Sequence, residues 1–153
     1  MDVRSELHRD HADHELELER LTCAVEARQS ATALLRGWQA FEENLVDHLD
    51  AEERHLFTVT VQAHRKEIEQ LRAEHRGIRE ALIALSAAVQ RNSLDKGAID
   101  EFRALLRAHS AHEEQTLHRW LEIDEGFLAL RGVLAIRDRR ERALARVRPQ
   151  SND

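Results

Sequence analysis

Apolar residues recur along this chain every three or four positions, the spacing at which a helix buries one face. The pattern runs through four long segments and lapses in the short stretches between them. It therefore predicts four helices, over residues 5–28, 31–57, 64–90 and 98–123. Because the connections are short, consecutive helices should run antiparallel, as in an up-down-up-down four-helix bundle.

A fifth amphipathic segment follows the predicted bundle. Its first turns carry Phe127, Leu130 and Leu134, and it becomes basic toward its end. We therefore expect a bundle over residues 1–125 and an additional C-terminal basic helix and tail over residues 126–153. The composition favours an all-α fold, because 34% of the residues are charged, 4% are aromatic and only one is a proline. A β fold would need more turn-forming and β-branched residues.

Charge is divided unevenly between these two parts. Residues 126–153 carry seven arginines against three acidic residues, a net charge of +4, so residues 1–125 must hold −10 to give the total of −6. An acidic bundle argues against nucleic acid as the main partner. The basic helix is either a solvated face, with pairs such as Asp138 and Arg142, or a surface for a protein partner or self-association.

Several features predict a soluble, cytoplasmic protein. The single Cys23 excludes an internal disulfide and fits a reducing compartment. The first residues are polar, unlike the start of a secretory signal. The longest apolar stretch, near 127–136, is far too short to cross a bilayer. No membrane is therefore expected as a partner.

Two stretches, residues 45–56 and 106–117, share the pattern L-x-x-H-x-x-x-E-E-x-x-L. On a helix, positions i and i+4 lie on one face, so His48 pairs with Glu52 in the first copy. The flanking leucines mark that face as inward. A histidine and a glutamate on a core-facing stripe cost free energy unless something satisfies them. Two such pairs that face each other suggest a metal.

The repeat extends beyond these stretches. Around His75 the apolar residues lie at offsets −4, +7, +10 and +14, and the same offsets around His11 also carry apolar residues. An acidic residue precedes each histidine, Asp10 in one case and Glu74 in the other. Centring on His14 breaks the match, so the pattern favours His11, although His14 stays an alternative. The chain thus consists of two helical hairpins that each contribute H…H-x-x-x-E.

The candidate metal site has six residues: His11, His48, Glu52, His75, His109 and Glu113. Four imidazoles and two carboxylates suit a pair of first-row transition metals, with iron or manganese favoured over a structural zinc site because no thiolate takes part. A lone helical histidine is more often structural than a ligand. The recurrence in register with leucines is what favours the metal.

The acidic residues that follow the candidate glutamates have two interpretations. Glu53 and Glu114 either hold ligand imidazoles by hydrogen bonds or face solvent. Among the other histidines, His112 could approach the site and His55 could lie near it, but the repeat supports neither.

The motifs D-H in the first helix, H-x-x-x-E-E in the second, E-H in the third and H-x-x-x-E-E in the fourth resemble the hemerythrin-like (HHE cation-binding) domains, over roughly residues 5–123. The resemblance implies a four-helix bundle around a non-haem di-iron centre, with the glutamates bridging the irons and the histidines capping them. An oxo or hydroxo bridge would complete the pair. Members of the family bind or sense oxygen, handle nitric oxide or peroxide, store iron, or aid iron–sulfur repair.

This chain departs from the oxygen carriers of that family, which have a second histidine one turn along the third helix. Here Arg79 follows His75 by four residues. We therefore expect a di-iron protein that reacts with or senses a small oxidant (oxygen, peroxide or nitric oxide), with peroxide- or nitric-oxide-related activity, rather than a simple oxygen carrier. The alternative is a metal-dependent regulatory or interaction module without turnover. Zinc or manganese could replace iron.

Overall fold

The computed structural model describes residues 3–60, 62–117, 119–120, 138–139 and 141–142, and this part of the chain contains four long helices and two short ones. The long helices are α1 (Val3–Glu26), α2 (Ala31–Glu52), α4 (Arg65–Gln90) and α5 (Lys96–Gln115). The short ones are the π-helix η1 (Glu53–Phe57) and α3 (Thr58–Thr60). Within these ranges there is no strand, as an all-α fold requires.

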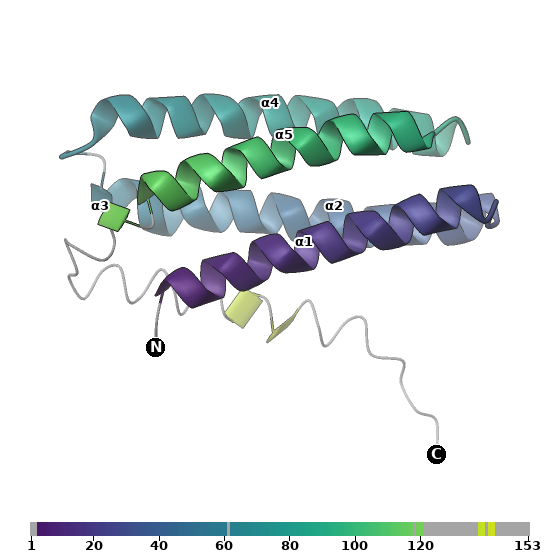
Figure 1. The fold of residues 1–153 in the computed structure, drawn as a ribbon, viewed down its shortest axis with the longest axis horizontal. Coiled ribbons are helices and arrows are strands. Elements are labelled where there is room, and N and C mark those ends of the chain that lie inside the picture. Colours follow the sequence, from purple (N-terminus) through teal and green to yellow (C-terminus); the bar gives the residue numbers. More distant parts are fainter. Residues whose placement is uncertain (1–2, 61, 118, 121–137, 140, 143–153) are drawn as a thin grey trace, which may run out of the picture.

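The long helices lie side by side and alternate in direction (Figure 1). α1 packs against α2, α2 against α4, α4 against α5 and α5 against α1, so each long helix has two neighbours around a common core. The predicted up-down-up-down four-helix bundle is therefore confirmed.

The two hairpins of the bundle turn in the same way. After α1, the amide of Gln29 donates to the carbonyl of Ala24 at 3.0 Å, and after α4 the amide of Ser93 donates to the carbonyl of Ala88 at 2.8 Å. Each of these six-residue closures contains one left-handed residue, Arg28 (φ 51°) or Asn92 (φ 52°). This hydrogen-bond pattern ends a helix sharply, so the repeat seen in the sequence extends to the turns.

Two boundaries differ from the expectation by more than two residues, and the others agree within two. The second helix was expected to continue to residue 57 as an α-helix, but it widens into η1 at Glu53. The wider turn allows the consecutive residues Leu56 and Phe57 to be buried together. α5 ends at Gln115, and the expected end at residue 123 lies outside the described residues.

The apolar core forms two clusters, separated along the helices by a layer of buried polar residues. The larger cluster includes Leu18, Trp38, Leu49 and Phe102. The smaller cluster consists of Leu7, Leu56, Phe57, Ile68, Leu71 and Leu117. On α1, for example, His11 lies between Leu7 of the smaller cluster and Leu18 of the larger one. The bundle therefore holds its buried histidines and glutamates between two apolar layers.

Of the C-terminal helix expected near residues 127–147, the structure describes only residues 138, 139, 141 and 142. The proposed division at residue 125 thus lies outside the described residues. Among the helices that are described, none is long and apolar enough to cross a membrane.

Candidate metal centre

The structure brings all six predicted residues together in the polar layer of the bundle. Four long helices contribute to it: His11 lies on α1, His48 and Glu52 on α2, His75 on α4, and His109 and Glu113 on α5. Their nitrogen and oxygen atoms form two groups, and within each group the atoms lie within 4.8 Å of one another. The first group contains His11 and His48, the second contains His75 and His109, and both glutamates belong to both groups.

The two oxygens of Glu52 lie toward different groups of donors. Oε1 lies 3.2 Å from Nε2 of His48 in the first group. Oε2 lies 3.5 Å from Nε2 of His75 in the second group. Since the side chain is fully buried, the carboxylate is held between the two groups rather than turned toward solvent.

Glu113 is divided in the same way, from the opposite side of the bundle. Its Oε2 lies 3.2 Å from Nε2 of His11, and its Oε1 lies 3.3 Å from Nε2 of His109. The Nε2 atoms of His75 and His109 lie only 3.1 Å apart. The ring nitrogens and carboxylate oxygens therefore converge on two neighbouring points.

Polar atoms at this centre have no hydrogen-bond partner within the described part of the chain. They include both oxygens of Glu52, both oxygens of Glu113 and Nε2 of His48. Burying carboxylate oxygens without donors costs free energy, and a cation is the chemical partner that such a group lacks. The donors are nitrogen and oxygen only, which suits first-row transition metals. The residues present therefore fit a metal site.

Three of the histidines are fixed by carboxylates behind them. Nδ1 of His48 lies 3.0 Å from Asp10, Nδ1 of His75 lies 2.9 Å from Glu53, and Nδ1 of His109 lies 2.8 Å from Glu74. A carboxylate only accepts, so each Nδ1 carries a hydrogen and donates it. In the neutral ring the lone pair of each Nε2 then points into the centre, and this is the tautomer that a metal ligand needs.

Two of these carboxylates, Asp10 and Glu74, hold the same position in the sequence repeat. Asp10 and Glu74 were recognised in the sequence only because each precedes a candidate histidine. In the structure each contacts the histidine of the neighbouring helix instead, Asp10 the ring of His48 and Glu74 the ring of His109. The sequence signal for both was the acidic residue at the same repeat position, but the spacing did not reveal its partner.

Glu53 and Glu114 hold equivalent positions in the repeat but have different surroundings. Glu53 accepts from Nδ1 of His75, whereas Glu114 is 42% exposed and lies 3.0 Å from His8 at the surface. Of the two interpretations that the sequence left open, hydrogen bonding to a candidate ligand applies to Glu53. The surface interpretation applies to Glu114.

This difference gives a matched pair of variants. We expect Glu53→Gln to weaken metal binding about 10- to 100-fold, because an amide holds the ring of His75 less firmly and makes it a weaker donor. Glu114→Gln should leave the affinity unchanged. Competition with a chelator of known affinity measures both, and equal affinities in the two variants would contradict the assigned role of Glu53.

In the metal-free protein, the positive charges of the buried histidines and the negative charges of the buried glutamates compensate each other. Burial lowers the pKa of His75, but the nearby carboxylates of Glu113 and Glu52 outweigh it and raise that pKa to about 10. The pKa of His109 rises to about 9, because the nearby carboxylate of Glu113 outweighs burial. Conversely, burial raises the pKa of Glu113, but the histidines around it hold it well below its usual value. A metal must therefore displace protons.

His14 lies outside both groups. Its ring is buried beside His48, at 5.0 Å between ring centroids, and its edge faces Phe41 at 6.3 Å. Burial, together with the charge of His48, holds the pKa of His14 well below 6.5. His14 is therefore a neutral ring packed next to the centre, and the alternative left open in the sequence does not match this geometry.

Three further residues bear on which side chains could be metal ligands: His112, His55 and Arg79. Nδ1 of His112 donates to Glu74 at 2.6 Å, so this ring supports the carboxylate behind His109. His55 is exposed. Arg79 turns to Asp50 and Glu53, each at 2.7 Å, rather than into the centre.

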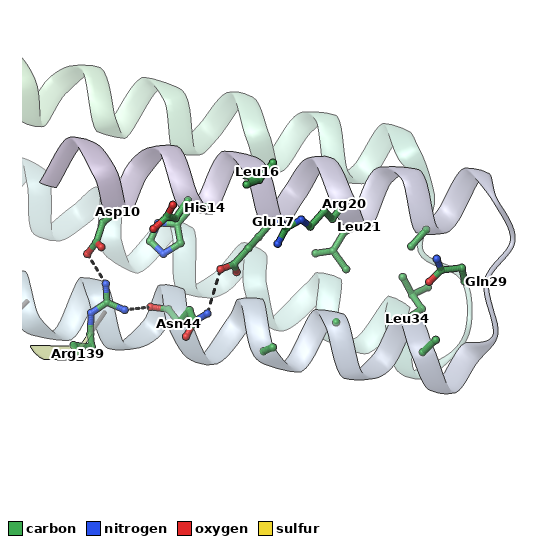
Figure 2. A pocket seen from close by; sticks show the side chains of 15 residues that line it. Asp10, His14, Leu16, Glu17, Arg20, Leu21, Gln29, Leu34, Asn44 and Arg139 are labelled. Carbon is green, nitrogen blue, oxygen red and sulfur yellow. Dashed lines mark hydrogen bonds and ion pairs between the residues drawn. The ribbon is translucent and has the colours of Figure 1, made fainter. Parts of the chain in front are cut away.

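Arg139 makes a further contact at the centre that sequence reasoning missed. It comes from the C-terminal segment and pairs with Asp10, the carboxylate behind His48 (Figure 2). No spacing rule links two residues that lie 129 positions apart.

A comparison with protein-family models matched the hemerythrin HHE cation-binding domain over residues 2–121. A second, overlapping match covers residues 66–147 and begins near the start of α4, where the second hairpin repeats the first. Searches of curated proteins and of solved structures found no match.

Proposed function

We propose, since this chain belongs to the hemerythrin HHE cation-binding family, that its four histidines and two glutamates hold two iron ions. The pair would react with or sense a small oxidant, namely oxygen, peroxide or nitric oxide. The observation that carries the proposal is the sharing of both glutamates between two groups of donors. A carboxylate with one oxygen toward each group is suited to bridge two ions.

The donor set supports a reactive centre over a closed structural one. Each group offers two imidazole nitrogens and two carboxylate oxygens, fewer atoms than the six that octahedral ions accept. Arg79, which replaces the extra histidine of the oxygen carriers, binds carboxylates instead. When bound, an iron pair would supply electrons to, or accept them from, a small ligand held at the open positions. Two buried carboxylates balance only part of the charge of two divalent ions, so hydroxide or oxide would balance the rest.

A cavity between α1 and α5 supports access by a small ligand. It has a volume of about 570 Å³ and is lined by His11, His48 and His109 of the centre and by Leu45, Leu49 and Leu106 beside them. Its lining also includes His8, Arg107 and Glu114 at the surface. It thus connects the surface with the centre, and its apolar wall would disfavour large or highly charged molecules.

Anaerobic reconstitution with ferrous iron tests the proposal. We expect about two irons per chain, one for each group of donors, and an absorption spectrum of a bridged ferric pair after exposure to air. The variant His48→Ala should bind less iron, because it removes one of only four donors of the first group. Binding of at most one iron by the natural sequence, or unchanged binding by the variant, would reject the di-iron centre.

A regulatory module without turnover is the second candidate, and one contact favours it. Arg139 connects the basic C-terminal segment to Asp10 behind the centre, so a change at the metal could reach a surface that binds a partner. Peroxide turnover by the iron-loaded protein would support an enzyme. Self-association or partner binding that depends on oxidation, without turnover, would support the regulatory module.

A further inference from the structure

Asp10 connects the candidate metal centre with the C-terminal segment through two hydrogen bonds. It is 2% exposed, and its Oδ2 atom accepts from Nδ1 of His48 at 3.0 Å. The same Oδ2 atom also accepts from Nη2 of Arg139. Figure 2 shows the guanidinium of Arg139 reaching from below to this carboxylate. One oxygen therefore serves a candidate metal ligand and a fixed positive charge at once.

Arg139 is buried in a way that a surface arginine is not. Its side chain is 10% exposed, and its Nη1 donates to the main-chain carbonyl of Asn44 on α2 at 2.9 Å. It closes one end of a cavity of about 420 Å³ between α1 and α2 (Figure 2). Burying a guanidinium is costly unless its charge is compensated, and Asp10 supplies that compensation.

Both neighbours keep Asp10 ionised. Nδ1 of His48 and Nη2 of Arg139 both donate to the same oxygen of this carboxylate, and the ionised form is the one that accepts from two such donors. The carboxylate therefore stays an acceptor for both donors. A stronger interaction with Arg139 draws negative charge toward the guanidinium, so the carboxylate of Asp10 attracts the hydrogen on Nδ1 of His48 less strongly.

The same arrangement occurs on the other side of the centre. Oε1 of Glu53 accepts from Nδ1 of His75 at 2.9 Å and from Nη1 of Arg79 at 2.7 Å. Each of the two groups of donors thus contains a histidine backed by a carboxylate oxygen that is shared with an arginine. The arrangement therefore occurs twice at the centre, built from different elements.

We propose that Arg139 is a positioning residue of the metal centre, which acts through Asp10 to raise the reduction potential of the ion held by His11 and His48. The inference rests on the proposed function. A carboxylate that pulls on the hydrogen of Nδ1 makes an imidazole a stronger donor, which stabilises the oxidised metal. Arg139 weakens that pull, and its own positive charge also disfavours the more highly charged ferric ion. Both effects have the same sign.

The test compares reduction potentials of iron-loaded variants. Arg139→Gln should shift the couple to more negative values by about tenfold in its equilibrium constant, which is about 59 mV for one electron. Arg142→Gln is the matched control, because it removes an exposed arginine from the same segment and should leave the potential unchanged. Arg139→Lys should restore most of the potential, since it restores the charge. Asp10→Asn should shift the potential in the opposite direction.

The outcomes separate this inference from the function on which it rests. If the natural sequence binds two irons and Arg139→Gln has the same potential as Arg142→Gln, the role of Arg139 is wrong and the di-iron centre stands. If the natural sequence does not bind two irons, the centre itself is wrong. Where Arg139→Gln does not fold, as judged by circular dichroism, Arg139→Met keeps the packing of the stem without the charge and must give the same negative shift.

Discussion

Replacing Glu113 by alanine is expected to abolish the binding of both iron ions, whereas replacing its neighbour Glu114 by alanine should leave two irons bound. The two residues are adjacent on α5 and chemically identical. Glu113 is fully buried, with one oxygen toward His11 and the other toward His109. Glu114 is exposed at the surface. The pair therefore separates loss of a shared ligand from loss of one negative charge on the same helix.

The expected loss is large because one substitution removes a donor from both groups. Each group keeps three protein atoms instead of four, and the negative charge between two cations is halved. We expect the iron content of Glu113→Ala to fall well below one per chain after gel filtration. Metal analysis of the two variants side by side measures it. Two irons retained by Glu113→Ala would show that this carboxylate is not a shared ligand.

The second large effect concerns pH in the metal-free protein, which is expected to become less stable as the pH rises from 7 to about 10.5. The pKa values of His75 and His109 in the folded chain are about 10 and about 9, above the ordinary value of 6.5. A raised folded pKa stabilises the fold fully below pH 6.5, and this contribution declines until the pH passes the folded pKa. Deprotonation leaves the buried Glu52 and Glu113 without compensating charge.

Thermal unfolding followed by circular dichroism measures this dependence. We expect the midpoint to fall by roughly 15–25 °C between pH 7 and 10.5, because the two raised pKa values together lose about five pKa units of stabilisation over this range, each unit equals 1.36 kcal/mol, and each kcal/mol moves the midpoint of a chain this size by about 2–4 °C. The iron-loaded protein is the control, because its imidazoles are already deprotonated and the metal supplies the positive charge. A metal-free midpoint that stays constant over this range would contradict the raised pKa values.

The same protons connect pH with metal binding. At pH 7 the metal-free His75 and His109 carry protons that an ion must displace, so affinity should increase with pH up to the range of their pKa values. This range lies above the 6.5 of an ordinary histidine. Acid should therefore release the metal more readily than ordinary histidine pKa values would imply.

The arrangement of the bundle could be predicted from the sequence because it depends on which face of each helix is apolar. The repeat of leucines around His11 and His75 marked the inward stripe, and Leu7, Leu18 and Leu71 are indeed buried. Short connections then fixed the antiparallel order. The π-helix after Glu52 was not predicted, because a periodic pattern of apolar residues does not indicate a single wide turn.

The candidate site was predictable for the same reason, since its six residues lie on the repeated stripe. The carboxylates and arginines around it were not. Asp10 contacts His48 across helices, and Glu53 and Glu114 differ although their sequence contexts match. Such contacts depend on how neighbouring helices are rotated and spaced, which a single helical period does not determine. That these six residues ligate iron stays a prediction.

The contact between Asp10 and Arg139 has a consequence for biosynthesis. It joins residues 129 positions apart, and every candidate ligand precedes Arg139 in the chain. The ribosome therefore adds all six candidate ligands before it adds Arg139, the partner of Asp10. A chain whose synthesis or processing stops before Arg139 would keep all six candidate ligands but would leave Asp10 without its guanidinium partner, so the surroundings of His48 would change although no ligand is lost.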